Sequence, residues 1–136
     1  ALSSTDRNAI ALWLERILKH TPARRLGVFP GMAERLDEPL AARAILRAAF
    51  ERDMPVVSAD YWTANWAAYF ADTDLAIDAL LRTPDSYGLW NPLMANVRRH
   101  PGFRQVVGKL GLDAYWREYG WPPFCRPVGT RDLQCE

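Results

Sequence analysis

The side chains best suited to chemistry are two histidines and two cysteines. His20 and His100 are the only histidines, and neither has a cysteine or a carboxylate at ligand spacing on the same turn of helix. Because a zinc site needs three or four convergent ligands, this pattern argues against one. Cys125 has no histidine near it in sequence, and a nucleophilic pair also needs a third group that orients the base. The sequence therefore predicts neither a metal centre nor a catalytic nucleophile.

Two further patterns fall short of ligand sites. Asp72, Asp74 and Asp78 could suggest a calcium loop, but the glycine and the closing glutamate of an EF-hand are missing. These acids are better explained as helix caps and first-turn charges that oppose the helix dipole. The glycines within residues 27–31 lack the spacing and the following lysine of a phosphate-binding loop. We therefore expect no enzyme, no cofactor and no catalytic residue.

The cysteines, Cys125 and Cys135, both lie in a segment that contains proline and glycine. Two cysteines are too few for a disulfide framework. We expect Cys125 to pack as a small apolar side chain and Cys135 to be a free thiol. A disulfide between the two is the alternative, if the protein lies in the periplasm.

The composition is that of a globular protein without a strong charge. Of 136 residues, 49% are hydrophobic, and 17 basic residues nearly balance 16 acidic ones. Since nucleic-acid-binding proteins more often have a clear basic excess, we expect no direct contact with nucleic acid. No hydrophobic run approaches the length of a transmembrane helix, and the chain does not open with a signal-peptide pattern. We expect a soluble protein without membrane insertion, with the cytoplasm favoured over the periplasm.

Apolar residues at helical spacing define two helices in the first half of the chain. One apolar stripe predicts a helix over residues 6–20. A second helix has Pro39 in its first turn, where the missing N–H costs nothing, and runs to about Asp53. The stripe of the first helix consists of Ile10, Trp13, Leu14, Ile17 and Leu18.

A helical hairpin is predicted in the middle of the chain. A third helix spans about residues 59–71, with Ser58 as its N-cap, and a fourth helix follows and ends at Thr83-Pro84. Because only a few residues connect them, the two helices should pack antiparallel. The third helix carries large rings at helical spacing, namely Trp62, Trp66, Tyr69 and Phe70.

Shorter helices are predicted in the last third of the chain. Gly111 and Gly120 stand where helix C-terminal caps are expected. The segment Trp121-Pro122-Pro123-Phe124 must be extended, and no stretch shows the alternation of a strand. The sequence therefore predicts an all-α fold. The short helices span about residues 91–99, 101–110 and 112–119.

The hairpin at residues 58–83 resembles a tetratricopeptide repeat, a helix–turn–helix unit of about 34 residues. Ala64 and Ala76 stand at the small positions of its two helices, Ala71-Asp72 at its Gly-Asp turn, and Leu80 at its large apolar site. The chain departs from the pattern in two places. The aromatic residue of the first helix is displaced, and the last small position of the second helix holds a threonine.

The last third resembles the segment that closes tetratricopeptide arrays in many bacterial proteins, so that the resemblance covers about residues 58–127. Such arrays are often fused to a winged-helix DNA-binding domain or an adenylate cyclase domain. The chain departs from the usual Asp-Pro-Arg-Phe, because His100 precedes the proline and Gly102 replaces the arginine. The matching motifs are Pro101-Gly102-Phe103-Arg104, Leu110-Gly111-Leu112, Tyr115-Trp116 and Gly120-Trp121-Pro122-Pro123-Phe124-Cys125.

The resemblance implies a short array of stacked antiparallel hairpins with a C-terminal capping tail. We expect one helical domain over residues 1–136. Residues 1–57 form unassigned helices, 58–83 the repeat-like hairpin, and 90–127 the capping helices and tail. The implied function is a non-enzymatic protein-interaction or scaffolding module of a larger bacterial regulatory protein. Its partner would be a protein segment or another domain of the same chain, and a homo-oligomer is possible.

Four residues are candidates for partner binding. On the repeat alignment, Tyr61 and Asn65 project from the first helix toward the concave side, where such arrays usually bind peptides. Arg98 and Arg99 could hold an acidic partner or a phosphate, although such pairs more often lie on a solvated face. An alternative function is a small-molecule-binding sensory domain with an aromatic pocket between helices. Trp62, Trp66 and Tyr69 would line that pocket, but rings at helical spacing are more often core.

Overall fold

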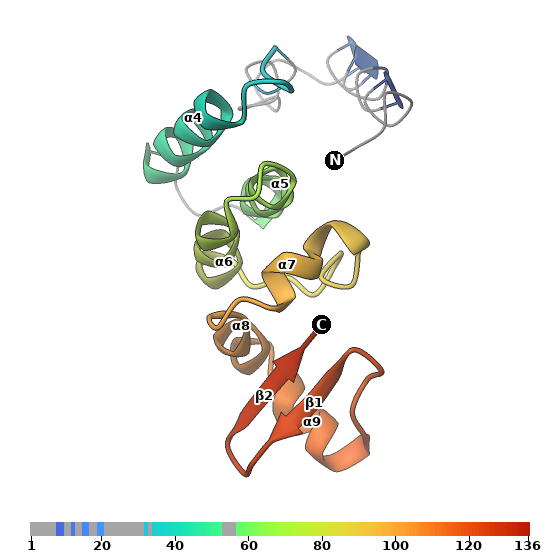
Figure 1. Ribbon diagram of the computed structural model, residues 1–136. Helices are drawn as coiled ribbons and strands as arrows, with labels where there is room; N and C mark the ends of the chain where they lie inside the picture. Colours follow the sequence, from blue (N-terminus) through green and yellow to red (C-terminus); the bar gives the residue numbers. More distant parts are fainter. Residues whose placement is uncertain are drawn as a thin grey trace. The chain divides into compact units, whose positions relative to one another are not determined.

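A computed structural model provides the fold (Figure 1). The chain divides into two compact units, Ala1–Ala49 and Phe50–Glu136, and each is described by itself. The single domain expected over the whole chain stays a prediction. The residues that the structure describes are 8–9, 12, 15–16, 19–20, 32, 34–52 and 57–136.

Helix α4 (Pro39–Arg52) confirms the second predicted helix and has Pro39 in its first turn as expected. Ala42, Leu46 and Ala49 are its buried residues, and their spacing places them on one face. Of the helix predicted over residues 6–20, the structure describes only some residues, all of them helical and exposed. The apolar stripe of that helix lies outside the described residues.

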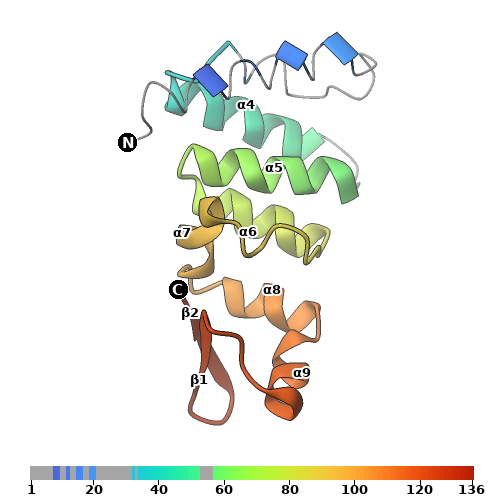
Figure 2. The same ribbon diagram turned by 90° about the vertical axis from the view of Figure 1, so that its right-hand side faces the viewer.

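Helices α5 (Val57–Tyr69) and α6 (Thr73–Arg82) confirm the predicted hairpin. They lie side by side and run antiparallel (Figure 2). Helix α5 begins one residue before Ser58, so Ser58 lies in its first turn and is not its N-cap. The interface between the helices uses small side chains, which let the backbones approach closely. The fully buried alanines of the two helices are Ala64, Ala67, Ala76 and Ala79.

The turn between α5 and α6 is a Schellman motif. The N–H of Asp72 donates to the carbonyl of Ala67 at 2.8 Å, and the N–H of Ala71 donates to that of Ala68 at 3.1 Å. Ala71 adopts a φ of 58°, and it is the one non-glycine residue with a positive φ in the described part of the chain. The carboxylate of Asp72 then caps α6 by accepting from the N–H of Leu75 at 3.2 Å. Left-handed backbone disfavours a side chain with a Cβ by about 1–2 kcal/mol.

Replacing Ala71 by glycine should raise the free energy of unfolding by roughly 0.5–1 kcal/mol. The gain is smaller than the left-handed penalty because glycine also loses more backbone entropy on folding. Ala68→Gly, one turn earlier in regular helix, is the matched control and should lower stability by about 1 kcal/mol. Urea denaturation followed by circular dichroism measures both. A loss of stability in both variants would show that Ala71 is not strained.

The carboxy-terminal helices confirm the prediction of three short helical segments, the first of which opens with a 3-10 turn. Gly111 and Gly120 lie at helix ends with φ of 69° and 111°, as their predicted capping positions require. The core here includes Val97, Phe103 and Val106, which have almost no exposed surface. The elements are η1 (Pro92–Met94), α7 (Ala95–Arg98), α8 (Phe103–Lys109) and α9 (Leu112–Tyr119).

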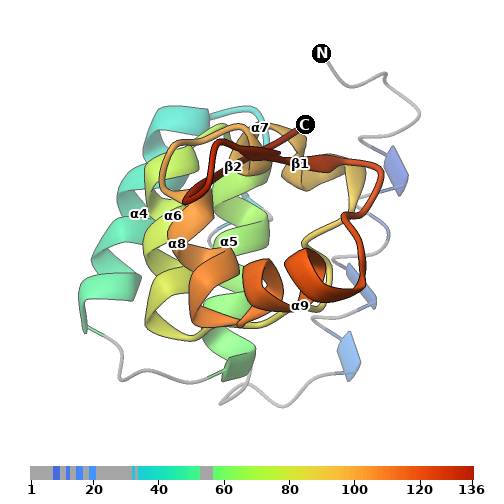
Figure 3. The same ribbon diagram turned by 90° about the horizontal axis from the view of Figure 1, so that it is seen from below.

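A small β-hairpin follows, which corrects the prediction of a purely helical chain. Strands β1 (Cys125–Val128) and β2 (Asp132–Cys135) pair antiparallel, and β2 contacts α8 (Figure 3). Each strand has only four residues, and in each only the cysteine is buried, so no alternation marks them in the sequence. The described part of the chain is therefore mostly helical with one two-stranded sheet.

The segment before the hairpin is a turn and not the predicted extended run. The N–H of Cys125 donates to the carbonyl of Pro122 at 3.1 Å. Pro123 occupies the second position of this turn, which its fixed φ favours. The ring of Trp121 lies 5.6 Å from that of Trp116, whereas Phe124 is 49% exposed. A capping role for this tail stays a prediction.

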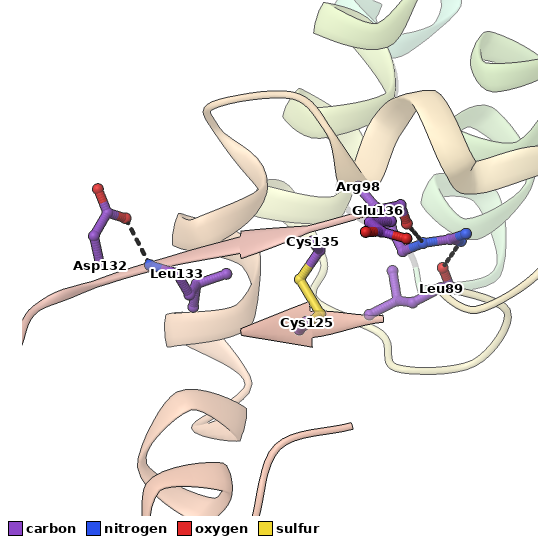
Figure 4. The surroundings of a disulfide bond; sticks show 7 residues. All are labelled: Leu89, Arg98, Cys125, Asp132, Leu133, Cys135 and Glu136. Atoms are coloured by element: carbon purple, nitrogen blue, oxygen red, sulfur yellow. Dashed lines mark hydrogen bonds between the residues drawn. A yellow bond between two sulfur atoms is a disulfide. The ribbon is translucent and has the colours of Figure 1, made fainter. Parts of the chain in front are cut away.

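Cys125 and Cys135 form a disulfide, so the expectation of a free Cys135 thiol was wrong (Figure 4). The cause is the register of the hairpin, which places the two cysteines directly opposite each other. Both side chains are buried, with 5% and 4% of their surface exposed. The bond therefore closes the open end of the hairpin.

Replacing both cysteines by alanine should lower the free energy of unfolding by roughly 2–3 kcal/mol, because the unfolded chain gains the entropy of an opened loop. Urea denaturation with and without a reductant measures this effect. The reductant should destabilise the wild-type chain and leave the double variant unchanged. Equal stability of the oxidised and reduced wild-type chain would show that the disulfide does not restrain the fold.

Candidate functional site

A pocket of about 170 Å³ opens where the segment from α7 to α8 faces strand β2. One wall is formed by residues from Arg98 to Arg104, and the other by residues from Asp132 to Cys135. The charged groups of the pocket are three arginines and one aspartate, so the pocket carries a net positive charge. It also contains Arg98 and Arg99, which the sequence analysis proposed for partner binding.

Arg98 is buried, with 7% of its surface exposed. Its Nη1 donates to the carbonyl oxygens of Leu89 and Asn91 at 2.8 and 2.9 Å, and its Nε donates to that of Glu136 (Figure 4). No ion pair joins it to a carboxylate of the described residues. Burial lowers the pKa of Arg98, and the charge of Arg99 lowers that pKa further. Arg98 is thus a buried cation that main-chain oxygens hold, and its guanidinium also lies 5.9 Å from the centre of the Phe124 ring.

Arg99 and Arg104 are the accessible cations of the pocket. The side chain of Arg99 is exposed and forms no ion pair or hydrogen bond with another described residue. Arg104 Nη1 lies 3.1 Å from Asp132 Oδ2, and the two side chains are 56% and 44% exposed. The other oxygen of Asp132 accepts from the N–H of Leu133 at 2.9 Å. The N–H of the following residue therefore holds the carboxylate of Asp132 at the rim of the pocket.

His100 joins the pocket to α6. Its Nδ1 accepts from the N–H of Gly102 at 3.0 Å, and its Nε2 lies 2.9 Å from Asp74 Oδ1. Because Nδ1 accepts, Nε2 carries the proton and donates to Asp74. A Cβ on Gly102 would lie 2.9 Å from Ile77 Cγ2, so a larger residue at this position would require Ile77 to move.

Tyr61 and Asn65 do not line this pocket. Tyr61 is half-buried, and its ring lies 5.8 Å from that of Tyr87 and against Gly88. Asn65 Nδ2 donates to the carbonyl of Tyr61 at 2.8 Å, within α5 itself. Tyr87 is 75% exposed, so an aromatic surface extends from this face of α5 to solvent. The four predicted partner residues thus lie at two places on the carboxy-terminal unit.

Arg104 and Asp132 were not predicted from the sequence as pocket residues. A buried ion pair in the α5–α6 hairpin was not predicted either. Asp60 has no exposed side-chain surface, and Arg82 Nε lies 3.0 Å from both of its oxygens. The hydroxyl of Thr83 donates to the same carboxylate. The guanidinium of Arg82 also stacks 3.6 Å above the ring of Phe50. This cluster holds the hairpin together and offers no open position for a ligand.

The aromatic stripe of α5 packs within the fold. Trp66 is 5% exposed, and its ring lies 5.6 Å from that of Tyr69 and 5.9 Å from that of Phe70. Neither the basic pocket nor a smaller one beside β1 is lined by these rings. A sensory pocket formed by Trp62, Trp66 and Tyr69 stays a prediction.

Within the described ranges, no group of three or more histidine, cysteine, aspartate or glutamate residues could hold a metal ion. No helix in the same part of the chain is long and apolar enough to cross a membrane. No family model matches the chain, and no curated protein or solved structure matches it either.

Proposed function

We propose that this chain is a non-enzymatic protein-interaction module built on antiparallel helical hairpins of tetratricopeptide type. The observation that carries the proposal is the pocket beside β2, where two adjacent arginines form no ion pair with a side-chain carboxylate of the described residues. Cations kept without a counter-ion at a concave surface suit the binding of an oppositely charged segment. The partner is a segment of another protein or another domain of the same chain.

Two features of the α5–α6 hairpin support the repeat assignment. Fully buried alanines lie on both helices of the hairpin and allow the helices to pack closely. The turn between the helices places Ala71 in left-handed backbone, at the position where the tetratricopeptide pattern has glycine. The aromatic surface that Tyr61 of α5 forms with Tyr87, from the segment after α6, provides a second surface for the same partner. The disulfide favours an oxidising compartment for this module over the cytoplasm that the composition suggested.

Site-specific photo-crosslinking tests the proposal. A photoreactive residue is placed at Arg99, at Tyr61, or at the exposed Arg131, which lies outside the pocket. In a lysate of the organism that makes the protein, positions 99 and 61 should give a discrete adduct that position 131 does not give. An adduct of twice the chain mass would identify a second copy as the partner. No adduct at 99 or 61, or the same adducts at 131, would contradict an interaction surface at these places.

A further inference from the structure

The charge of the pocket is local and is not part of a generally basic surface. The whole chain carries a formal net charge of only +1. The pocket nevertheless gathers Arg98, Arg99 and Arg104 against a single carboxylate, that of Asp132. Arg98 and Arg99 are consecutive and repel each other, and within the described residues neither forms an ion pair with a side-chain carboxylate. An anion bound here would remove an unfavourable interaction that the free protein contains.

The size of the pocket restricts what the anion can be. About 170 Å³ accommodates one side-chain-sized group, whereas pockets for drug-sized ligands and cofactors are roughly 300–1,000 Å³. Guanidinium groups match planar or tetrahedral oxyanions through paired N–H donors. Nε and Nη1 of Arg98 already donate to three main-chain oxygens, and Arg98 is buried, whereas Arg99 and Arg104 are exposed to an incoming anion. The direct hydrogen bonds to the anion must then come from Arg99 and Arg104.

The contact of Asp132 with Arg104 favours a carboxylate over other oxyanions as the anion that this pocket binds. It places a carboxylate of the protein itself on Arg104 at the rim, 3.1 Å from Nη1. Because both partners are about half exposed, such a pair contributes little to stability, and an incoming carboxylate can replace or share it at little cost. Asp132 therefore occupies part of the site in the free protein and competes with the partner's acid.

We propose that the pocket anchors the carboxylate of an acidic side chain in the partner segment, with Arg99 and Arg104 as its contacts and Asp132 as an internal competitor. This inference rests on the proposed function, since it names the chemistry of the partner for the same site.

Fluorescence anisotropy with labelled peptides tests it on the full chain with the disulfide intact. The probes are Gly-Ser peptides of equal length that carry two glutamates, two glutamines or two phosphoserines. The glutamate peptide should bind and the glutamine peptide should not. Arg99→Gln should weaken binding of the glutamate peptide about tenfold. Asp132→Asn should strengthen it by roughly two- to fivefold, because it removes the competing charge and keeps an oxygen for the N–H of Leu133.

Arg131→Gln is the matched control, since it removes the same charge from an exposed position outside the pocket and should change the affinity less than about twofold. Equal weakening by Arg99→Gln and Arg131→Gln would overturn the site, because only net charge would then matter. Weaker binding by Asp132→Asn would overturn its role as competitor. A phosphoserine peptide that binds over tenfold tighter would overturn the choice of carboxylate. Crosslinking at position 99 without binding of the glutamate peptide would overturn the inference and leave the proposed function standing.

Discussion

Replacing Asp60 by alanine should lower the free energy of unfolding by about 3–5 kcal/mol, the range observed when one partner of a buried ion pair is removed. The carboxylate has no exposed surface and accepts from both Arg82 and Thr83. Without it, a mostly buried guanidinium loses its counter-ion. Urea denaturation monitored by tryptophan fluorescence measures the loss.

Two variants separate the ion pair from other effects of the Asp60 substitution. Asp78→Ala removes an exposed aspartate from α6 and should change stability by less than about 0.5 kcal/mol. Asp60→Leu combined with Arg82→Met replaces both charges by apolar groups and should recover part of the loss, because no charge then remains buried. If the double variant loses more than the sum of its two single variants, the pair is not the source of the effect.

Replacing Arg98 by alanine should lower the free energy of unfolding by about 3 kcal/mol. Its guanidinium is the shared donor for carbonyl oxygens from two segments, the loop before α7 and the end of β2. Removing it takes this donor from the carbonyl of the buried Leu89 and from the main-chain oxygen of Glu136, whereas the carbonyl of Asn91 still accepts from the N–H of Met94. Arg98→Lys should lose about half as much, because one ammonium does not reach all three oxygens. Thermal and urea denaturation report the change.

Arg99 provides the control at the neighbouring position. Its side chain is exposed and repels the charge of Arg98, so Arg99→Ala should leave stability within about 0.5 kcal/mol of the wild type. Similar losses in the Arg98 and Arg99 variants would show that the carbonyl contacts do not stabilise the fold. Only the peptide-binding measurement would then test a role of Arg98 and Arg99.

Much of the helical content could be predicted because it depends on neighbours in sequence. Pro39 at the start of α4 and the glycines after α8 and α9 impose backbone angles at their own positions. The alanines of α5 and α6 recur at helical spacing, and the short turn between these helices permits only an antiparallel hairpin. Such signals act within one or two turns, so the sequence alone carries them.

The β-hairpin could not be predicted in the same way. Its strands are four residues long, and the partner of each residue lies across the turn and not at a regular spacing. The pairing of Cys125 with Cys135 follows from that register. The number of cysteines carries no information on the register, and it therefore favoured a free thiol at Cys135. The fit of β2 against α8 then creates the pocket wall that contains Asp132.

For Arg98 and Arg99, some properties could be predicted from the sequence, and others depend on the tertiary structure. The sequence by itself determined that two adjacent cations stand at the end of a short helix, and it indicated an acidic partner or a phosphate as their ligand. Only the tertiary structure decided that Arg98 is buried on main-chain carbonyls while Arg99 remains open beside Arg104. The reason is that helices form from local hydrogen bonds and side-chain spacing, whereas burial and charge pairing depend on segments far apart in the chain. Arg104 meets Asp132 across 28 residues, and Arg82 meets Asp60 across 22.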